Sequence, residues 1–392
     1  MKRILFIIIS SSLSFHAFGQ GSLRSVLQEI EQNSPTLKAA AAEMEAERLA
    51  GKAETLLANP EIEFNYLWGA ENIGGRHDLR ISQSFDIPTL AGMKAGKAGN
   101  IGEMAALKYK AERQSVLLEA KQTYIDLVFY QFILDELGSH LGQAAQLVDS
   151  YEKRLAAGGA TVLDLNKAKI HQTSIQGQIN KTEAERQALL SGLRAMNGGK
   201  EINPGALSYD FDDDFPDDFE TWFADASAKS PVLGYVRKQV ELEEKQLAID
   251  KASTLPELAV GYMSEIRTGE KFRGVTLGVN IPLWSAGNKV RQSRAKAAAA
   301  VERRNAAEQA FFYELRNQYD QARAMKENSG MMRRSLQETD NREYLLSALS
   351  RGEISMIDYL VEIDLYYDAL TATLEAERDY HHALASLNAC SL

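Results

Sequence analysis

The residues able to carry chemistry are scattered through this sequence and form no recognisable catalytic motif. It contains no HExxH, no phosphate-binding Gly-x4-Gly-Lys-Ser/Thr and no Gly-x-Ser-x-Gly. Among the histidines, His77, His140 and His171 stand apart in the chain. His381 and His382 are adjacent on a predicted helix, where neighbouring side chains point in different directions. We therefore expect no enzyme activity, no metal centre and no cofactor.

Aspartates are the other candidates for chemistry. Oxygen-rich clusters suit hard cations such as Ca²⁺, but the spacing of the cluster between residues 201 and 221 fits no EF-hand loop. A solvated acidic link is the favoured interpretation, with a cation site as the alternative. Asp164 and Asp358 lie in the first turns of predicted helices, where the helix dipole stabilises a carboxylate. The clustered residues are Asp210, Asp212, Asp213, Asp214, Asp217 and Asp218.

The chain repeats its own pattern at a distance of about 195 residues. Ser34-Pro35 recurs as Ser230-Pro231, and the segment 158–164 recurs as 352–358. Repeats of this length indicate a duplicated architecture and not a solenoid unit. We expect a first repeat over 20–200 and a second over 222–392, joined by the acidic link 201–221.

Each repeat contains two runs in which apolar and polar residues alternate. The runs cover about 60–68 and 78–87 in the first repeat, and about 257–266 and 274–281 in the second. Period-two alternation predicts strands with one apolar face. Such strands suit either an outer-membrane barrel or a hairpin half-buried in a soluble sheet, and the pattern alone favours neither. The residues expected to face lipid in a barrel are Ile62, Phe64, Tyr66, Val275, Leu277 and Val279.

A long stretch without proline follows each strand pair, at 89–157 and 283–351. As continuous helices these would each reach about 100 Å at 1.5 Å per residue. The apolar spacing follows the 3-4 rhythm of a coiled coil. Small residues at the helix starts predict crowded packing, although the glycines of 91–102 leave open a loop that enters a helix near Ile101. Thr161 and Ser355 are the expected caps of the returning helices.

The first 19 residues have the pattern of a secretory signal peptide. Lys2 and Arg3 precede a short apolar stretch, and Ala17-Phe18-Gly19 fits a cleavage site. The alternative, a membrane anchor, is disfavoured because spanning a bilayer takes about 20 apolar residues. Cleavage would leave 42 basic and 54 acidic residues, a net charge of −12, which argues against nucleic-acid binding. No other stretch could span as a helix, so a membrane crossing would use strands.

The signal peptide, the duplicated pattern and one turn signature resemble the TolC family of outer-membrane efflux proteins. The signature Arg-x3-Gly-x5-Asp stands here as Arg154, Gly158 and Asp164. The second copy keeps Gly352 and Asp358, but its arginine, Arg351, directly precedes the glycine. The resemblance covers nearly the whole chain after the signal peptide. Within the family, the sequence looks most like members that serve heavy-metal cation efflux.

The resemblance implies a homotrimer in the outer membrane of a Gram-negative bacterium. Each protomer would give four strands to one shared twelve-stranded barrel, and the helices would form a hollow periplasmic cylinder. Independently of the family, four strands are too few to close a barrel, which also favours three copies. The implied function is passive: a conduit for substrates driven by an inner-membrane pump, of the resistance-nodulation-division type, through a periplasmic adaptor. Drugs or secreted proteins are alternative cargoes.

The resemblance also assigns roles at the predicted helix turns. Asp358 matches a constriction of the closed tip, and Asp164 is its counterpart in the first repeat; Val361 stands where some relatives have a second acid. The rival interpretation is a periplasmic coiled-coil scaffold or adaptor without a pore. The expected adaptor contacts are Arg154, Gly158, Thr161, Arg351, Gly352 and Ser355.

Overall fold

The computed structural model describes residues 23–69, 74–86, 88–209, 211, 214–267, 269–281 and 286–392. The predicted signal peptide therefore lies outside the described residues, as do Asp210, Asp212 and Asp213 of the acidic cluster. The chain divides into two compact units. The first combines the residues up to Gln32 with Thr123–Phe211, and the second combines Asn33–Gln122 with Asp212–Leu392.

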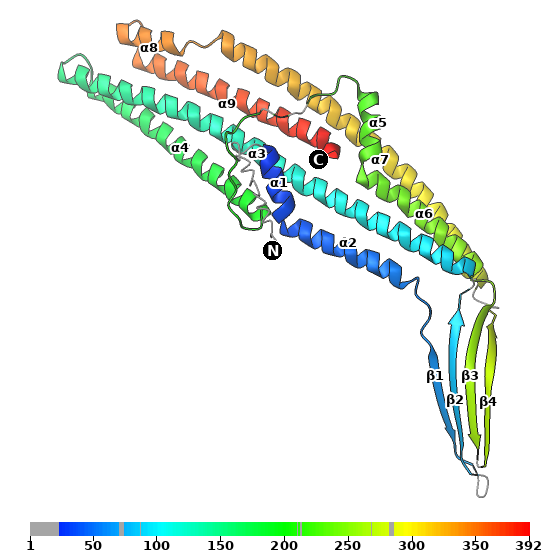
Figure 1. Cartoon of the computed structure of the whole chain (residues 1–392). Helices are drawn as coiled ribbons and strands as arrows, with labels where there is room; N and C mark the ends of the chain where they lie inside the picture. The colour runs from blue at the N-terminus through cyan, green and yellow to red at the C-terminus, as the bar shows by residue number, and fades with distance from the viewer. Residues whose placement is uncertain are drawn as a thin grey trace, which may run out of the picture. The chain divides into compact units, whose positions relative to one another are not determined.

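Helices form most of both units (Figure 1). The fold class predicted from the sequence, mainly helical with a small sheet, is confirmed. The helices are α1 Leu23–Asn33, α2 Pro35–Ala53, α3 Pro88–Ala156, α4 Val162–Met196, α5 Phe219–Lys229, α6 Pro231–Ala252, α7 Ala286–Glu338, α8 Arg342–Arg351 and α9 Met356–Leu387, followed by a 3-10 turn at Asn388–Ser391.

No helix in the described part of the chain is both long enough and apolar enough to cross a membrane.

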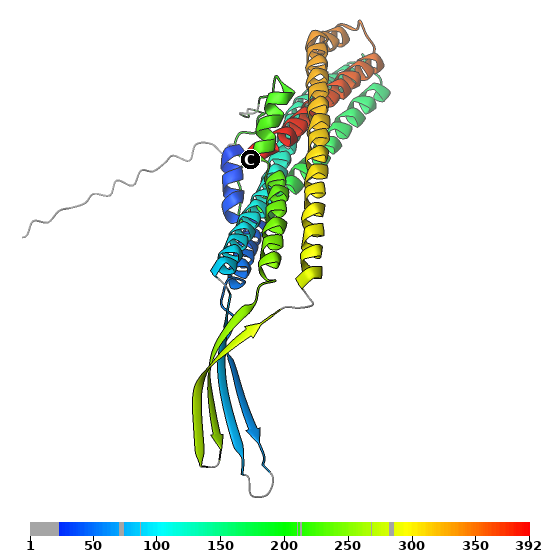
Figure 2. The same ribbon diagram turned by 90° about the vertical axis from the view of Figure 1, so that its right-hand side faces the viewer.

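The second unit contains one antiparallel sheet of four strands in the order β1-β2-β3-β4. The strands are β1 Glu61–Leu67, β2 Arg76–Phe85, β3 Glu257–Arg267 and β4 Glu270–Asn280. The hairpins of the two repeats thus join into one sheet because β2 pairs with β3. Both hairpin connections lie at the same end of the sheet, away from the helices that lead into and out of it (Figures 1 and 2).

The long helix of the first repeat is continuous. α3 runs for 69 residues from Pro88, so the alternative of a loop over 91–102 was wrong. Within this chain its glycines are not crowded, because a Cβ added at Gly92, Gly96 or Gly99 would meet nothing within 4 Å. The close approach lies instead at Gly51 of α2, where an added Cβ would be 3.3 Å from the Ile101 side chain.

The second repeat departs from this pattern, and the expectation of one continuous helix over 283–351 was wrong. α7 ends at Glu338, and α8 begins at Arg342. Between them, the Asp340 carboxylate accepts hydrogen bonds from the Arg342 backbone N–H at 3.3 Å and from its guanidinium at 2.8 Å. Short polar side chains compete in this way with helical hydrogen bonding, which favours a break.

Each unit has its own packed core. In the first unit, the second half of α3 packs against α4 through Leu137, Ala144 and Ile175. In the second, an aromatic cluster around Phe219 and Tyr319 joins α5 to α7. Clusters of this kind account for much of the stability of a helical protein because they remove large apolar areas from water.

The end of the predicted acidic link is structured. Asp218 caps α5 by accepting a hydrogen bond from the Thr221 backbone N–H at 2.8 Å. Phe215 packs against the aromatic cluster, and the Tyr319 hydroxyl donates to the Pro216 carbonyl at 3.1 Å. The described part of this segment is therefore anchored by its aromatic residues, and Asp218 serves as a helix cap.

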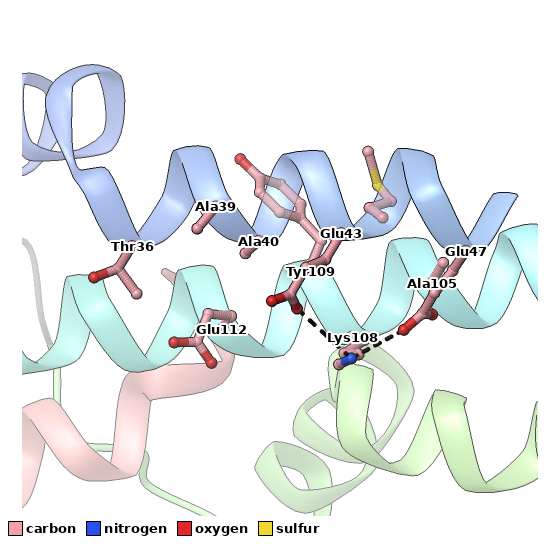
Figure 3. A pocket seen from close by; sticks show the side chains of 10 residues that line it. Thr36, Ala39, Ala40, Glu43, Glu47, Ala105, Lys108, Tyr109 and Glu112 are labelled. Atoms are coloured by element: carbon pink, nitrogen blue, oxygen red, sulfur yellow. Dashed lines mark hydrogen bonds and ion pairs between the residues drawn. The ribbon is translucent and has the colours of Figure 1, made fainter. Parts of the chain in front are cut away.

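α2 lies along the first part of α3 in the second unit, as Figure 3 shows. Small residues line the groove between them, including Ala39, Ala40 and Ala105, and leave a hollow of about 420 Å³. The Lys108 ammonium lies 3.0 Å from Glu47 and 3.8 Å from Glu43 across this groove. Exposed ion pairs of this kind add little stability.

Candidate functional site

The sheet has two chemically different faces. Residues paired across antiparallel strands point to the same side, so one continuous row contains Ile62, Ile81, Tyr262 and Val275. The side that carries this row is called the apolar face here. Its exposed members include Val275 at 76% and Leu277 at 81% of full exposure. The remaining apolar side chains on it are Phe64, Tyr66, Leu79, Phe85, Leu258, Val260, Ile266 and Val279.

The six residues predicted to face lipid all lie on the apolar face, and all are exposed in the single chain. Because successive strand residues point to opposite sides, a shift of one residue in pairing would have moved them all to the other face. The single chain does not show what covers this face in an assembly. The contact of these six residues with lipid therefore stays a prediction.

The opposite side, called the polar face here, carries small and charged residues. Gly261 pairs with Thr276 there, and Ala259 pairs with Gly278. The acidic residues outnumber the basic ones by six to three, a net charge of −3 per sheet. The acids are Glu61, Glu63, Asp78, Glu257, Glu265 and Glu270, and the bases are Arg76, Arg80 and Arg267.

The two outer strands come from different repeats. β1 pairs only with β2, and β4 pairs only with β3 among the described strands. Each outer strand therefore presents a row of backbone N–H and C=O groups without strand partners in this chain. Long apolar edges of this kind are templates for pairing with another strand.

The two helix turns named by the sequence signature share one design. Gly158 ends the turn after α3 with φ of 72°, and Gly352 follows α8 with φ of 75°. These are left-handed conformations that glycine adopts without a steric penalty. Thr161 and Ser355 then cap α4 and α9, which confirms both predicted caps.

Asp164 and Asp358 complete these caps. Each carboxylate accepts hydrogen bonds from the hydroxyl, at 2.6 Å, and the backbone N–H, at 3.2 Å, of the cap residue three positions earlier. The hydroxyl bond, followed by the backbone bond, holds the pKa of each carboxyl below its usual value. Both aspartates are therefore charged at neutral pH. The capping box explains their presence without a pore, so their role at a constriction stays a prediction.

The two arginines of the signature have separate surroundings. The Arg154 guanidinium lies over the Tyr151 ring, 5.1 Å from its centroid. Arg351 forms an ion pair with Glu353 at 2.8 Å. Both side chains are exposed, and their contact with an adaptor is untested.

His140 and His171 were thought to be isolated, but the structure brings them together. Their Nε2 atoms are 3.2 Å apart in the seam between α3 and α4. His140 is only 4% exposed, and burial, with the charge of His171 second, lowers its pKa to about 4. The described residues contain no group of three or more His, Cys, Asp or Glu that could hold a metal.

Two basic residues on the apolar face were missed by the sequence argument. β4 begins at Glu270, four residues before the predicted start at Gly274, so Lys271 and Arg273 belong to the strand. They follow the same alternation as Val275, and extending that pattern backwards would have found them.

No family model and no curated protein sequence matches this chain. Solved structures do match: the CmeC outer-membrane channel of Campylobacter jejuni is 16% identical, with a TM-score of 0.75 over 94% of this chain and 85% of that one. A CusC structure, described in terms of transmembrane channel formation, is 14% identical with a TM-score of 0.77 over 94% and 91%.

A third match is the open state of the MtrE outer-membrane channel of Neisseria gonorrhoeae, 12% identical with a TM-score of 0.74 over 95% of this chain and 89% of that one. At these identities the likeness defines the fold. The chain thus has the fold of these outer-membrane channels, the fold that its resemblance to the TolC family predicts.

Proposed function

We propose that this chain is the outer-membrane channel subunit of a tripartite efflux system in a Gram-negative bacterium. Three copies surround one passive conduit. The observation that carries the proposal is the four-stranded sheet with an exposed apolar face and two edges that lack strand partners. Four strands cannot close a barrel, since membrane barrels begin at about eight.

Three copies together supply enough strands for a barrel and pair the free edges of each sheet. β4 of one copy pairs with β1 of the next, and three such seams give a closed barrel of twelve strands without edges. The apolar face then contacts outer-membrane lipid, and the polar face lines the lumen. The helices continue from the barrel as a periplasmic cylinder of shared helices.

The charge of the polar face supports a conduit that favours cations. Six acids against three bases give −3 per chain, and three chains give −9 around one lumen. Charged rings that line a pore attract ions of the opposite sign. Three copies of Asp358 at a constriction would act in the same direction. Heavy-metal cations are the proposed cargo on this ground and on the family resemblance.

The helix turns at 154–161 and 351–355 are proposed to contact a periplasmic adaptor, which links the channel to an inner-membrane pump of the resistance-nodulation-division type. Their support is the shared glycine turn and the exposure of both segments. The pump supplies the energy, and the channel itself catalyses no reaction.

Membrane fractionation together with mass measurement tests the proposal. The full chain should sediment with outer membranes and, after extraction in mild detergent, have the mass of three copies by native mass spectrometry. Reconstituted in planar bilayers, it should give cation-selective conductance. A soluble monomer would contradict the proposal and favour the periplasmic scaffold instead.

A further inference from the structure

The charges on the apolar face are confined to one place. On all four strands, the only Lys, Arg, Asp or Glu side chains on this face are Lys271 and Arg273. Both belong to β4, and both lie toward the hairpin end of the sheet. Along β4, the apolar residues of this face follow directly after them, at Val275, Leu277 and Val279. The polar face, by contrast, carries both signs of charge toward the hairpin end and only the acids Glu61 and Glu257 nearer the helices.

Neither basic residue has a charge partner within the described residues. Lys271 and Arg273 are exposed and form no ion pair with any described side chain. β1, the strand that would lie beside β4 in the trimer, carries Ile62, Phe64 and Tyr66 on this face and no acid. The neighbouring copy therefore supplies no counter-charge from its described strand.

A hollow lies beside Lys271 at the hairpin end. It has a volume of about 620 Å³ and is lined by Tyr66, His77, Ile266 and Lys271, and also by Gly75, Arg267, Gly269 and Glu270. The first four residues form one row across the four strands. The Tyr66 and His77 rings are 4.7 Å apart. This row offers two rings, an aliphatic side chain and an ammonium group to one ligand.

The position of the hollow identifies the kind of ligand. In the proposed assembly the apolar face contacts lipid, and the hairpin end is the end away from the periplasmic helices. Lys271 and Arg273 then lie at the headgroup level of the outer leaflet, with their aliphatic stems along the apolar surface. A guanidinium binds phosphate in a bidentate manner and an ammonium binds it as a point charge.

We propose that Lys271 and Arg273, together with Tyr66 and His77, which line the same hollow as Lys271, bind the phosphate-bearing headgroup of an outer-leaflet lipid. This inference rests on the proposed function. Because β4 is an outer strand, Lys271 and Arg273 lie at the seam with the next copy, and each trimer has three such sites. A bound lipid that contacts both strands of a seam stabilises the trimer.

The test uses the purified full-length trimer in mild detergent, with diphosphoryl lipid A as the probe. Native mass spectrometry counts the lipids retained, and the temperature of trimer dissociation reports their effect. Dephosphorylated lipid A and phosphatidylcholine test the need for the phosphate headgroup. Inorganic phosphate in excess tests whether free anion competes. The variant is Lys271→Gln with Arg273→Gln. The matched control is Arg76→Gln with Arg80→Gln, which removes the same charge from the polar face of the same sheet.

We expect the trimer to retain diphosphoryl lipid A at least about tenfold better than the dephosphorylated form, and to dissociate at a higher temperature with it. The Lys271/Arg273 variant should lose this preference, and the Arg76/Arg80 control should keep it. Equal retention by the Lys271/Arg273 variant, retention of phosphatidylcholine as strong as that of lipid A, or full competition by inorganic phosphate would overturn the inference. A trimer that conducts ions but shows no lipid preference refutes this inference alone, whereas a soluble monomer refutes the proposed function as well.

Discussion

The carboxylate of Asp358 accepts two hydrogen bonds from Ser355, one from its hydroxyl at 2.6 Å and one from its backbone N–H at 3.2 Å. Asp164 and Thr161 repeat this arrangement in the first repeat. The repeats differ one turn later: the Lys167 ammonium lies 3.7 Å from Asp164, whereas the corresponding position after Asp358 is Val361. The two caps thus share a geometry but differ in local charge.

This difference predicts unequal effects of neutralising the two aspartates. Asp358→Asn should weaken block of the reconstituted channel by divalent cations several-fold. In the wild type, the three uncompensated Asp358 carboxylates repel one another and attract cations, and the substitution removes their charge. Asp164→Asn should change the block much less, since Lys167 already offsets its charge. Single-channel recording in planar bilayers measures both variants. If both behave like the wild type, Asp358 is only a helix-start residue.

The capping role of Ser355 can be measured separately from any effect on conductance. Ser355→Ala should destabilise the start of α9 by about 1 kcal/mol, the usual effect of losing a helix cap. Hydrogen exchange of the amides in the first turn of α9 should become faster. Ser350→Ala is a suitable control because Ser350 lies in α8, is exposed and donates only to the Ser347 carbonyl. Equal exchange in both variants would show that the cap contributes nothing.

The His140–His171 contact predicts a pH dependence of the first unit. Burial and the charge of His171 place the pKa of His140 at about 4 in the folded protein, whereas an unfolded histidine has a pKa of about 6.5. The unfolded chain therefore binds more protons between these values. The contribution of His140 to stability is fully present above about pH 6.5 and is lost as the pH falls toward 4, by at most about 3 kcal/mol.

Thermal unfolding of the detergent-solubilised protein at pH 7.5 and pH 5 measures this dependence. His140→Gln should reduce the difference in melting temperature between the two pH values. His77→Gln, at an exposed position of β2, should leave it unchanged. An undiminished difference in the His140 variant would assign the acid sensitivity to other groups.

The two faces of β4 should differ in whether they tolerate an added charged side chain. Leu277→Lys places an ammonium on the apolar face, and in the middle of a bilayer this costs about 2–4 kcal/mol per copy. We expect loss of outer-membrane trimers. Thr276→Lys, one residue away on the polar face, should insert and assemble. The yield of trimer in membrane extracts is the readout. Normal assembly of the Leu277 variant would mean that this face does not contact lipid.

Much of this fold could be predicted because its regular elements leave recognisable patterns in the sequence. Strands with one apolar face produce the alternation of Ile62, Phe64 and Tyr66, and the absence of proline permits a helix as long as α3. The capping residues Thr161 and Ser355 were predictable because their hydrogen bonds are local. These features depend on neighbours only a few residues away.

The remaining features depend on competition or on distant partners. The break between α7 and α8 results from Asp340 bonding locally to Arg342 in place of a helical turn. The meeting of His140 and His171 depends on the registry of two antiparallel helices. Distance from the turn at 157–161 alone would not have paired them, because His140 lies 17 residues before this turn and His171 lies 10 residues after it. The glycines of α3 do not mark close packing within this chain, because a Cβ added at Gly92, Gly96 or Gly99 would meet nothing within 4 Å.

The most direct test of the account is cross-linking of β4 to β1 of another copy. With Cys390 replaced by Ser, one cysteine is placed at Glu63 of β1 and another at successive positions from Arg273 to Leu277 of β4. After oxidation in membranes, we predict that one β4 position gives covalent dimers and trimers on denaturing gels. When the first cysteine is placed at Arg80, on the inner strand β2, and not at Glu63, no such products should form. Absence of intermolecular products at every position, with the protein in the soluble fraction, would contradict the account.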